Sequence, residues 1–145
     1  MAKQGTVYVP TLLVYELWRD GFLFGGVTAK KKAQLAKTCE EHSKSFRRAL
    51  ASGVKIAFGS DTFELPGTNP RELEVMVREG MKPLDALRAG TSVSAALLGI
   101  EGVTGALKPG LAADVIAVRG DPRTDMKALR EVVLVMRDGA IQLRR

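Results

Sequence analysis

Two short apolar runs, separated by one long amphipathic stretch, organise the first part of the chain. Residues 6–12 and 54–58 are rich in apolar and β-branched side chains and are predicted as strands. Between them, apolar positions recur at helical spacing from Thr28, a capping residue, to about residue 52, and Gly53 follows as a stop signal. A strand, a helix and a strand in this order predict a parallel pair with a right-handed crossover.

Three short helices are predicted after a loop at residues 62–68. Asn69 is expected to cap the first, with Pro70 at its first helical position and Glu72 reaching back to complete a capping box. The other two are expected to begin at Pro83, with Leu84 and Leu87 facing inward, and at Thr91, with Gly99 as its stop.

From about residue 102 the pattern changes to short strands and turns. Strands are predicted at residues 104–108 and 114–118, joined by a Pro109-Gly110 pair suited to a type II turn. The apolar residues 132–136 and 140–143 flank Asp138-Gly139, which is typical of a β-hairpin with a type I′ turn.

The predicted fold class is therefore α/β, in two parts. Residues 1–101 carry the parallel strands and their helices, and residues 102–145 carry short antiparallel strands. Two parallel strands cannot close a sheet, and short strands leave unpaired edges. If the sheet belongs to a (β/α)₈ barrel, which takes about 250 residues, residues 1–101 would supply only its last part.

Composition indicates a globular chain and narrows the classes of partner. Of the 145 residues, 46% are apolar and 26% are charged, and the net charge is +6 with a pI near 9.7. The basic residues are spread along the chain without aromatic interleaving, so we expect no nucleic-acid partner. No run approaches the roughly 18 apolar residues of a membrane span, and a single Cys fits a reducing compartment. A cytoplasmic location is expected.

Asp61 is the strongest candidate for chemistry. It closely follows the buried run 54–58, and catalytic groups of α/β proteins gather at the carboxyl ends of parallel strands. The alternative is that Asp61 only caps a loop or pairs with a basic side chain.

The other chemistry-bearing residues are expected to be structural. One His and one Cys cannot build a His or Cys metal cluster. His42 lies among charged residues in the middle of the long helix, and Cys39 on the same helix is expected to be a packed side chain rather than a nucleophile. Asp114 and Asp121 fall at turns and strand starts.

Taken together, these segments resemble the carboxy-terminal part of a metal-dependent amidohydrolase, in the branch of imidazolonepropionase-like enzymes and zinc-dependent Xaa-Pro dipeptidases or carboxypeptidases. The resemblance covers nearly the whole chain. The segments that carry it are residues 9–12, 53–61, 71–73, 80–88, 91–99, 105–114 and 132–139. The family more often has Gly-Thr-Asp where this chain has Gly59-Ser60-Asp61, and Lys82 replaces a more usual capping Thr.

The resemblance implies a fold and a site. Residues 1–101 would be strands seven and eight of a TIM (β/α)₈ barrel with the helices that follow, and residues 102–145 the last strands of a small β-sandwich. Asp61 would be the strand-eight aspartate, which contacts a divalent metal, expected to be zinc, and shuttles a proton. Thr11 and Thr62, at strand ends on the same face, would contact the substrate; the alternative is that they are ordinary turn hydroxyls.

The resemblance also implies that most of the active site lies elsewhere. The family's other metal-binding histidines and its bridging lysine would precede Met1. We therefore expect that this chain alone is inactive and holds no metal tightly, and that it associates with an amino-terminal barrel segment or with copies of itself. The substrate of the complete enzyme would be a small peptide or amide. The alternatives are a non-catalytic assembly module derived from the same fold and a basic binding module.

Overall fold

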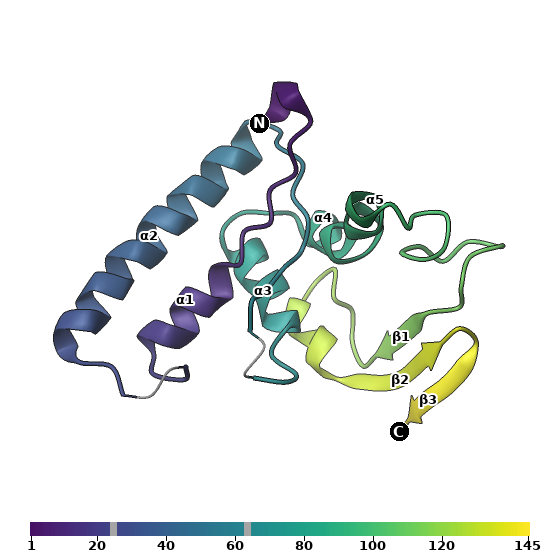
Figure 1. The fold of residues 1–145 in the computed structure, drawn as a ribbon. Helices are drawn as coiled ribbons and strands as arrows, with labels where there is room; N and C mark the ends of the chain where they lie inside the picture. The colour runs from purple at the N-terminus through teal and green to yellow at the C-terminus, as the bar shows by residue number, and fades with distance from the viewer. Residues whose placement is uncertain (24–25, 63–64) are drawn as a thin grey trace.

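Helices dominate the first two thirds of the chain, and a small sheet follows them (Figure 1). The structure is a computed structural model and describes residues 1–23, 26–62 and 65–145. In chain order, its elements are η1 (Ala2–Gln4), α1 (Leu12–Arg19), α2 (Ala29–Ala51), α3 (Pro70–Arg78), α4 (Pro83–Arg88), the π-helical turn η2 (Ala89–Val93), α5 (Ser94–Leu98), β1 (Val115–Val118), η3 (Met126–Arg130), β2 (Val132–Arg137) and β3 (Ala140–Arg144).

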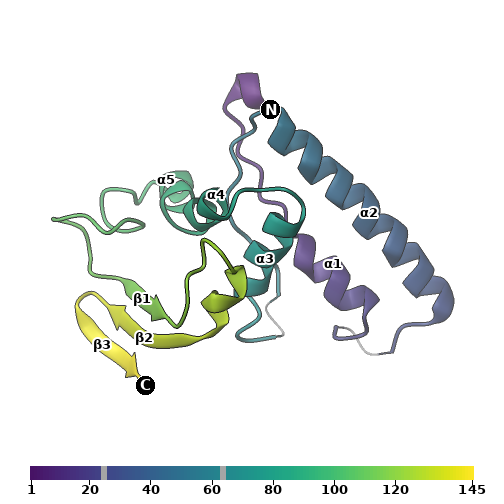
Figure 2. The ribbon, with the colours of Figure 1, turned by 180° about the vertical axis from the view of Figure 1, so that it is seen from behind.

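The long predicted helix is confirmed as α2. The Thr28 hydroxyl oxygen accepts a hydrogen bond from the Lys31 amide at 3.2 Å, and Gly53 adopts a φ of 66° after the last turn. The fully buried Phe46 lies on its inner face. α1 packs along α2, and both views of the ribbon show the two helices side by side (Figures 1 and 2).

The two predicted strands pair in parallel, but over a much shorter length than predicted. A single parallel bridge joins Tyr8 and Ile56. The Tyr8 amide donates to the Lys55 carbonyl, and the Ala57 amide donates to the Tyr8 carbonyl, both at 2.9 Å. The sequence thus predicted the direction of pairing correctly and overestimated its extent.

The prediction that the first strand reaches residue 12 was wrong. Thr11 turns the chain with a φ of 47°, and α1 begins at Leu12. Leu12, Leu13 and Leu17 are buried on one side of this helix. An apolar run of this length suits a strand or a buried helix equally, and packing decides between them.

The short helices form near the predicted positions, but two of their predicted caps were wrong. Asn69 makes no side-chain cap, and the carboxylate of Glu72 points away from it. Thr91 is not a cap either, because its hydroxyl donates to the Leu87 carbonyl inside a helix that runs on through η2. Gly99 ends α5 with a φ of 71°, as predicted. Leu87 packs against the core, whereas Leu84 is 47% exposed and does not face inward.

The carboxy-terminal part forms an antiparallel sheet in the order β1-β2-β3. The hairpin is confirmed, since Asp138 and Gly139 both have a positive φ, as a type I′ turn requires. The Pro109-Gly110 turn is confirmed by the Leu111 amide, which donates to the Lys108 carbonyl at 3.2 Å. The predicted strand at residues 104–108 was wrong, because this segment consists of turns and irregular structure.

One core unites the helical part with the turn η3. Its buried side chains are Leu12, Leu13, Leu17, Leu23, Phe46, Ile56, Leu73, Val75, Met76, Met81, Ala86, Ala89, Met126 and Leu129. Within the described residues there is neither a closed barrel nor a second sheet, and the division at residue 101 stays a prediction. No helix among these residues is long and apolar enough to cross a bilayer.

Candidate active site at the end of the paired segments

Asp61 lies beyond the parallel bridge, at the end of the extended segment that contains Ile56. Its side chain is exposed, and its backbone takes the left-handed conformation with a φ of 53°. Few residues other than glycine adopt this conformation, and Asp is one that tolerates it. The turn at Asp61 ends the extended segment and presents a carboxylate to solvent. Residues 63 and 64 of the predicted loop that follows lie outside the described residues.

The close approach of residues 9–11 to residue 59 explains why glycine occupies position 59. A Cβ on Gly59 would lie 2.5 Å from Cγ1 of Val9 and 3.6 Å from Cγ2 of Thr11. Glycine therefore allows residues 9–11 to pass close to residue 59. This places Thr11 beside the backbone that leads to Asp61.

Side chains hold the residues on either side of Asp61. The Ser60 hydroxyl donates to Oδ1 of Asn69 at 2.7 Å, and the Thr62 hydroxyl lies 3.0 Å from both the Ser60 oxygen and Oδ1 of Asn69. Thr68 approaches Thr62 at 3.1 Å and donates to the Leu65 carbonyl at 2.7 Å. Ser60 and Thr62 are both buried. The exposed acid thus sits between two anchored hydroxyl residues.

Glu72 lies near this site, and its predicted role in a capping box was wrong. Its carboxylate accepts hydrogen bonds from the Leu12 amide at 2.8 Å and from the Leu13 amide at 2.7 Å, at the start of α1. Its exposed fraction is 0%. Burial raises the pKa of this carboxyl to about 7, although both amides hold it down. A signal was present in the sequence, because Glu72 shares a helical face with the apolar Val75 and Met76.

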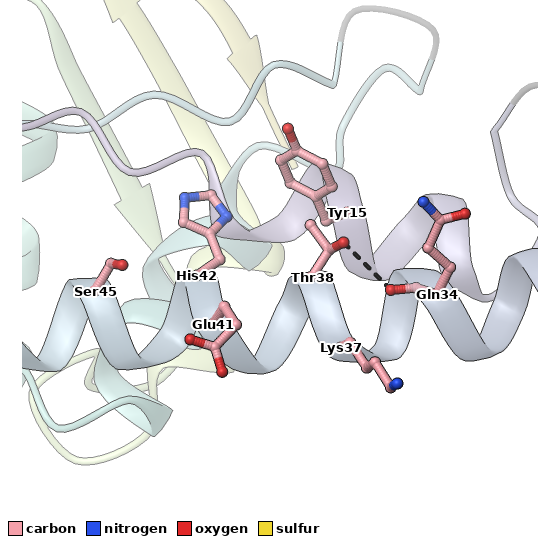
Figure 3. Close-up of a pocket in the computed structure, with 7 residues that line it drawn as sticks. All are labelled: Tyr15, Gln34, Lys37, Thr38, Glu41, His42 and Ser45. Atoms are coloured by element: carbon pink, nitrogen blue, oxygen red, sulfur yellow. Dashed lines mark hydrogen bonds between the residues drawn. The ribbon is translucent and has the colours of Figure 1, made fainter.

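The single histidine packs against an aromatic ring. His42 meets Tyr15 edge to face, with ring centroids 5.3 Å apart, beside an open pocket of about 470 Å³ between α1 and α2 (Figure 3). Burial lowers the pKa of His42, and a hydrogen bond with the Pro10 backbone opposes this shift. In the same pocket, the Thr38 hydroxyl donates to the Gln34 carbonyl of its own helix at 3.2 Å. The side chains of Lys37 and Glu41 point away from Tyr15 and His42 (Figure 3).

Local contacts or burial give structural settings to the three remaining candidates, Cys39, Asp114 and Asp121. Cys39 is half-buried, and burial raises the pKa of its thiol, which disfavours the reactive thiolate. Asp114 accepts hydrogen bonds from the Thr104 hydroxyl at 2.9 Å and the Asp138 amide at 2.8 Å, so it ties the hairpin turn to an earlier loop. Asp121 pairs with Arg123 in a turn.

A metal centre is not complete within the described part of the chain. No three of its His, Cys, Asp and Glu side chains lie close enough together to hold an ion. Asp61 offers one carboxylate, and the neighbouring Ser60, Thr62 and Asn69 satisfy one another through hydrogen bonds. The residues present therefore do not fit a metal by themselves.

Comparisons with known proteins agree on one family. The match described as the amidohydrolase family covers residues 19–142. Among curated proteins, ochratoxinase of Aspergillus niger is 36% identical over 138 residues, which are 90% of this chain and 27% of that protein.

Solved structures give the same result. A Xaa-Pro dipeptidase with methionine bound in its active site matches with a TM-score of 0.85 and 34% identity, over 99% of this chain and 36% of that one. Aspergillus niger ochratoxinase matches with a TM-score of 0.81 and 32% identity, over 99% and 34%. A putative prolidase from Bifidobacterium longum matches with a TM-score of 0.81 and 29% identity, over 96% and 35%. The chain thus spans between 27% and 36% of the length of these relatives.

Proposed function

The chain belongs to the amidohydrolase family, and we propose that it is part of an enzyme that hydrolyses the C–N bond of a small amide or peptide. It forms the last strands of the barrel and part of the small β-sandwich of that enzyme. Because the chain spans only about a third of the structures it matches, the remaining site residues come from other segments.

Asp61 carries this proposal. A carboxylate that accepts a proton from the attacking water and returns it to the leaving nitrogen must be accessible and fixed in direction. Asp61 is exposed, and its two buried neighbours, Ser60 and Thr62, are held in place by hydrogen bonds to Asn69. This combination supports a role as the proton shuttle of the reaction.

A divalent metal, expected to be zinc, belongs to the proposal only for the complete enzyme. Asp61 would give one ligand, whereas a catalytic zinc site takes about three from protein. The others would have to come from outside the described residues, in which no such group is formed.

The substrate class follows the relatives. The names of the matched proteins describe a Xaa-Pro dipeptidase and an ochratoxinase, so Xaa-Pro dipeptides and amino-acid amides are the substrates to test. Thr11 and Thr62 are the proposed substrate contacts. Thr11 is the more accessible of the two, because it is half-buried while Thr62 is 4% exposed.

The apolar surface of the chain supports association with other segments. Leu107 is 83% exposed, and an apolar groove of about 600 Å³ lies between the helices and the sheet, lined by Phe58, Leu73, Ile116 and Val118 among others. Exposed apolar surface of this kind is typical of an interface. We assign it to the amino-terminal barrel segment or to a second copy of the chain.

A chimera tests the proposed function. This chain would replace the matching part of the Xaa-Pro dipeptidase, where the fold agrees with a TM-score of 0.85, and hydrolysis of Xaa-Pro dipeptides would be measured with zinc supplied. The chimera should be active, and Asp61→Asn should reduce its turnover at least about a hundredfold, because the amide cannot accept the proton.

Asp85→Asn is the matched control, since Asp85 is an exposed acid on α4 that pairs with Arg88. It should leave turnover within about twofold, the range of a surface change. Near-normal turnover of Asp61→Asn in the active chimera would show that another group moves the proton. A folded chimera that hydrolyses none of the dipeptides or amides would favour the non-catalytic module.

A further inference from the structure

Two side chains at the start of α3 hydrogen-bond to the two segments that carry the candidate site, one near Thr11 and one near Asp61. Glu72 reaches the start of α1, directly after Thr11, through hydrogen bonds of 2.8 and 2.7 Å to the amides of Leu12 and Leu13. Asn69 reaches the residues on either side of Asp61. One short piece of helix therefore contacts both segments at their ends.

Glu72 supplies the hydrogen-bond acceptor that the N-cap residue of α1 does not provide. The first amides of a helix have no partner within it, and a residue at the N-cap usually accepts from one of them. Thr11 is the N-cap of α1, but with a φ of 47° its side chain makes no such bond. The carboxylate of Glu72 takes that place and lies where the helix dipole favours a negative charge. The hydrogen-bond partners that the structure gives Glu72 are these two amides.

Asn69, like Glu72, bonds to another segment instead of capping its own helix. It stands at the N-cap of α3, yet its side chain caps nothing there. Its Oδ1 instead accepts from Ser60 at 2.7 Å and lies 3.0 Å from the Thr62 hydroxyl. Both hydroxyl residues are buried, and the left-handed turn of Asp61 lies between them. A backbone in this conformation persists only where its surroundings hold it.

We propose that Glu72 and Asn69 are positioning residues of the active site: from the first turn of α3, Glu72 fixes the turn at Thr11 and Asn69 fixes the turn at Asp61. This inference rests on the proposed function for its catalytic meaning, but the two contacts can be measured without turnover. Neither residue would touch the substrate. Each would set the direction of a residue that does.

Nuclear magnetic resonance of the whole chain tests the Glu72 contact. In Glu72→Gln one of the two amides loses its acceptor, so the amide proton of either Leu12 or Leu13 should exchange at least about tenfold faster than in the wild type. Glu41→Gln is the matched control, because the same change is made on an exposed residue of α2. An increase in exchange rate that is uniform along the chain, or no larger than in the control, would overturn the local role of Glu72.

The wild-type chain provides a second measurement that does not depend on the variant folding. The amide shifts of Leu12 and Leu13 should follow the carboxyl carbon of Glu72 through one common pH midpoint. Amide shifts that do not move with this carboxyl would overturn the contact.

The Asn69 contact is tested by the backbone coupling of Asp61, which changes when φ changes. Asn69→Ala removes the acceptor and should change this coupling, whereas Asn69→Asp keeps an acceptor oxygen and should preserve it. A coupling unchanged in Asn69→Ala would show that Asp61 holds its turn without help. Because these readouts need no substrate, they can fail while the chimera is active, and they can succeed while it is not.

Discussion

Replacing Glu72 should change how the stability of the chain depends on pH. Burial raises the pKa of this carboxyl from its usual 4.5 to about 7. The Leu13 and Leu12 amides oppose the shift, the negative charge of Glu16 on α1 adds to it, and the positive charge of Arg78 opposes it. Burial, and after it the negative charge of Glu72, raises the pKa of Tyr8 in the amino-terminal segment. The native state therefore binds a proton here more tightly than the unfolded chain does.

The direction and size of the effect follow from this difference. Between pH 4.5 and 7 the native chain holds more protons than the unfolded chain, so the free energy of unfolding falls as pH rises. The contribution is fully present below pH 4.5 and is lost as pH rises through about 7. A shift of this size corresponds to about 3 kcal/mol. Glu72 is completely buried, so water does not screen it directly.

Urea unfolding followed by circular dichroism, from pH 4.5 to 8.5, measures this contribution. The wild type should lose about 3 kcal/mol relative to Glu72→Gln across the range. Comparing the two proteins cancels His42, whose pKa is lowered by burial and whose contribution has the opposite sign. Glu41→Gln should parallel the wild type. Parallel curves for the wild type and Glu72→Gln would refute the reasoning, because they would mean that the carboxyl titrates alike in both states.

Substitutions of glycine by alanine give two further predictions. Gly105→Ala should destabilise the chain by about 2 kcal/mol more than Gly110→Ala, because both have a positive φ but only a Cβ at 105 would lie 2.5 Å from Ala95; thermal melts of equal midpoint would contradict this. Gly59→Ala should cost about 1–3 kcal/mol, and most of that cost should disappear in a Val9→Ala background, because Val9 supplies the clash. A double-mutant cycle with no coupling would show that residues 9 and 59 do not meet.

Elements specified by local chemistry were predictable from the sequence. α2 carries its own cap at Thr28 and its own stop at Gly53, and the hairpin carries the two residues that a type I′ turn needs at Asp138 and Gly139. In these places the residues that decide the structure are neighbours in the chain. The position of Asp61 after an apolar run belongs to the same class, because strand ends can be located from the pattern alone.

The partners of Glu72 could not be predicted, because they lie 60 and 59 residues away in the sequence. The capping box assigned to Asn69 and Glu72 uses the same spacing as a true one, but the approach of α1 redirects Glu72, and the hydroxyls of Ser60 and Thr62 redirect Asn69. The start of α1 at Leu12 could not be predicted for the same reason. Its amides are satisfied by an acid that no local pattern connects to them.

The brevity of the parallel pairing explains why side chains matter so much at this site. Two hydrogen bonds join the segments near Tyr8, and beyond Ala57 the described backbone bonds turn elsewhere, as the Phe58 amide donates to the Ala89 carbonyl. A longer ladder would fix the strand ends through the backbone itself. Here the last residues before Asp61 are held by hydroxyls and an amide oxygen, and the turn at Thr11 by a buried carboxylate. The geometry of the candidate site therefore depends on α3, and changes in its first turn should disturb Asp61 and Thr11 before they disturb the core.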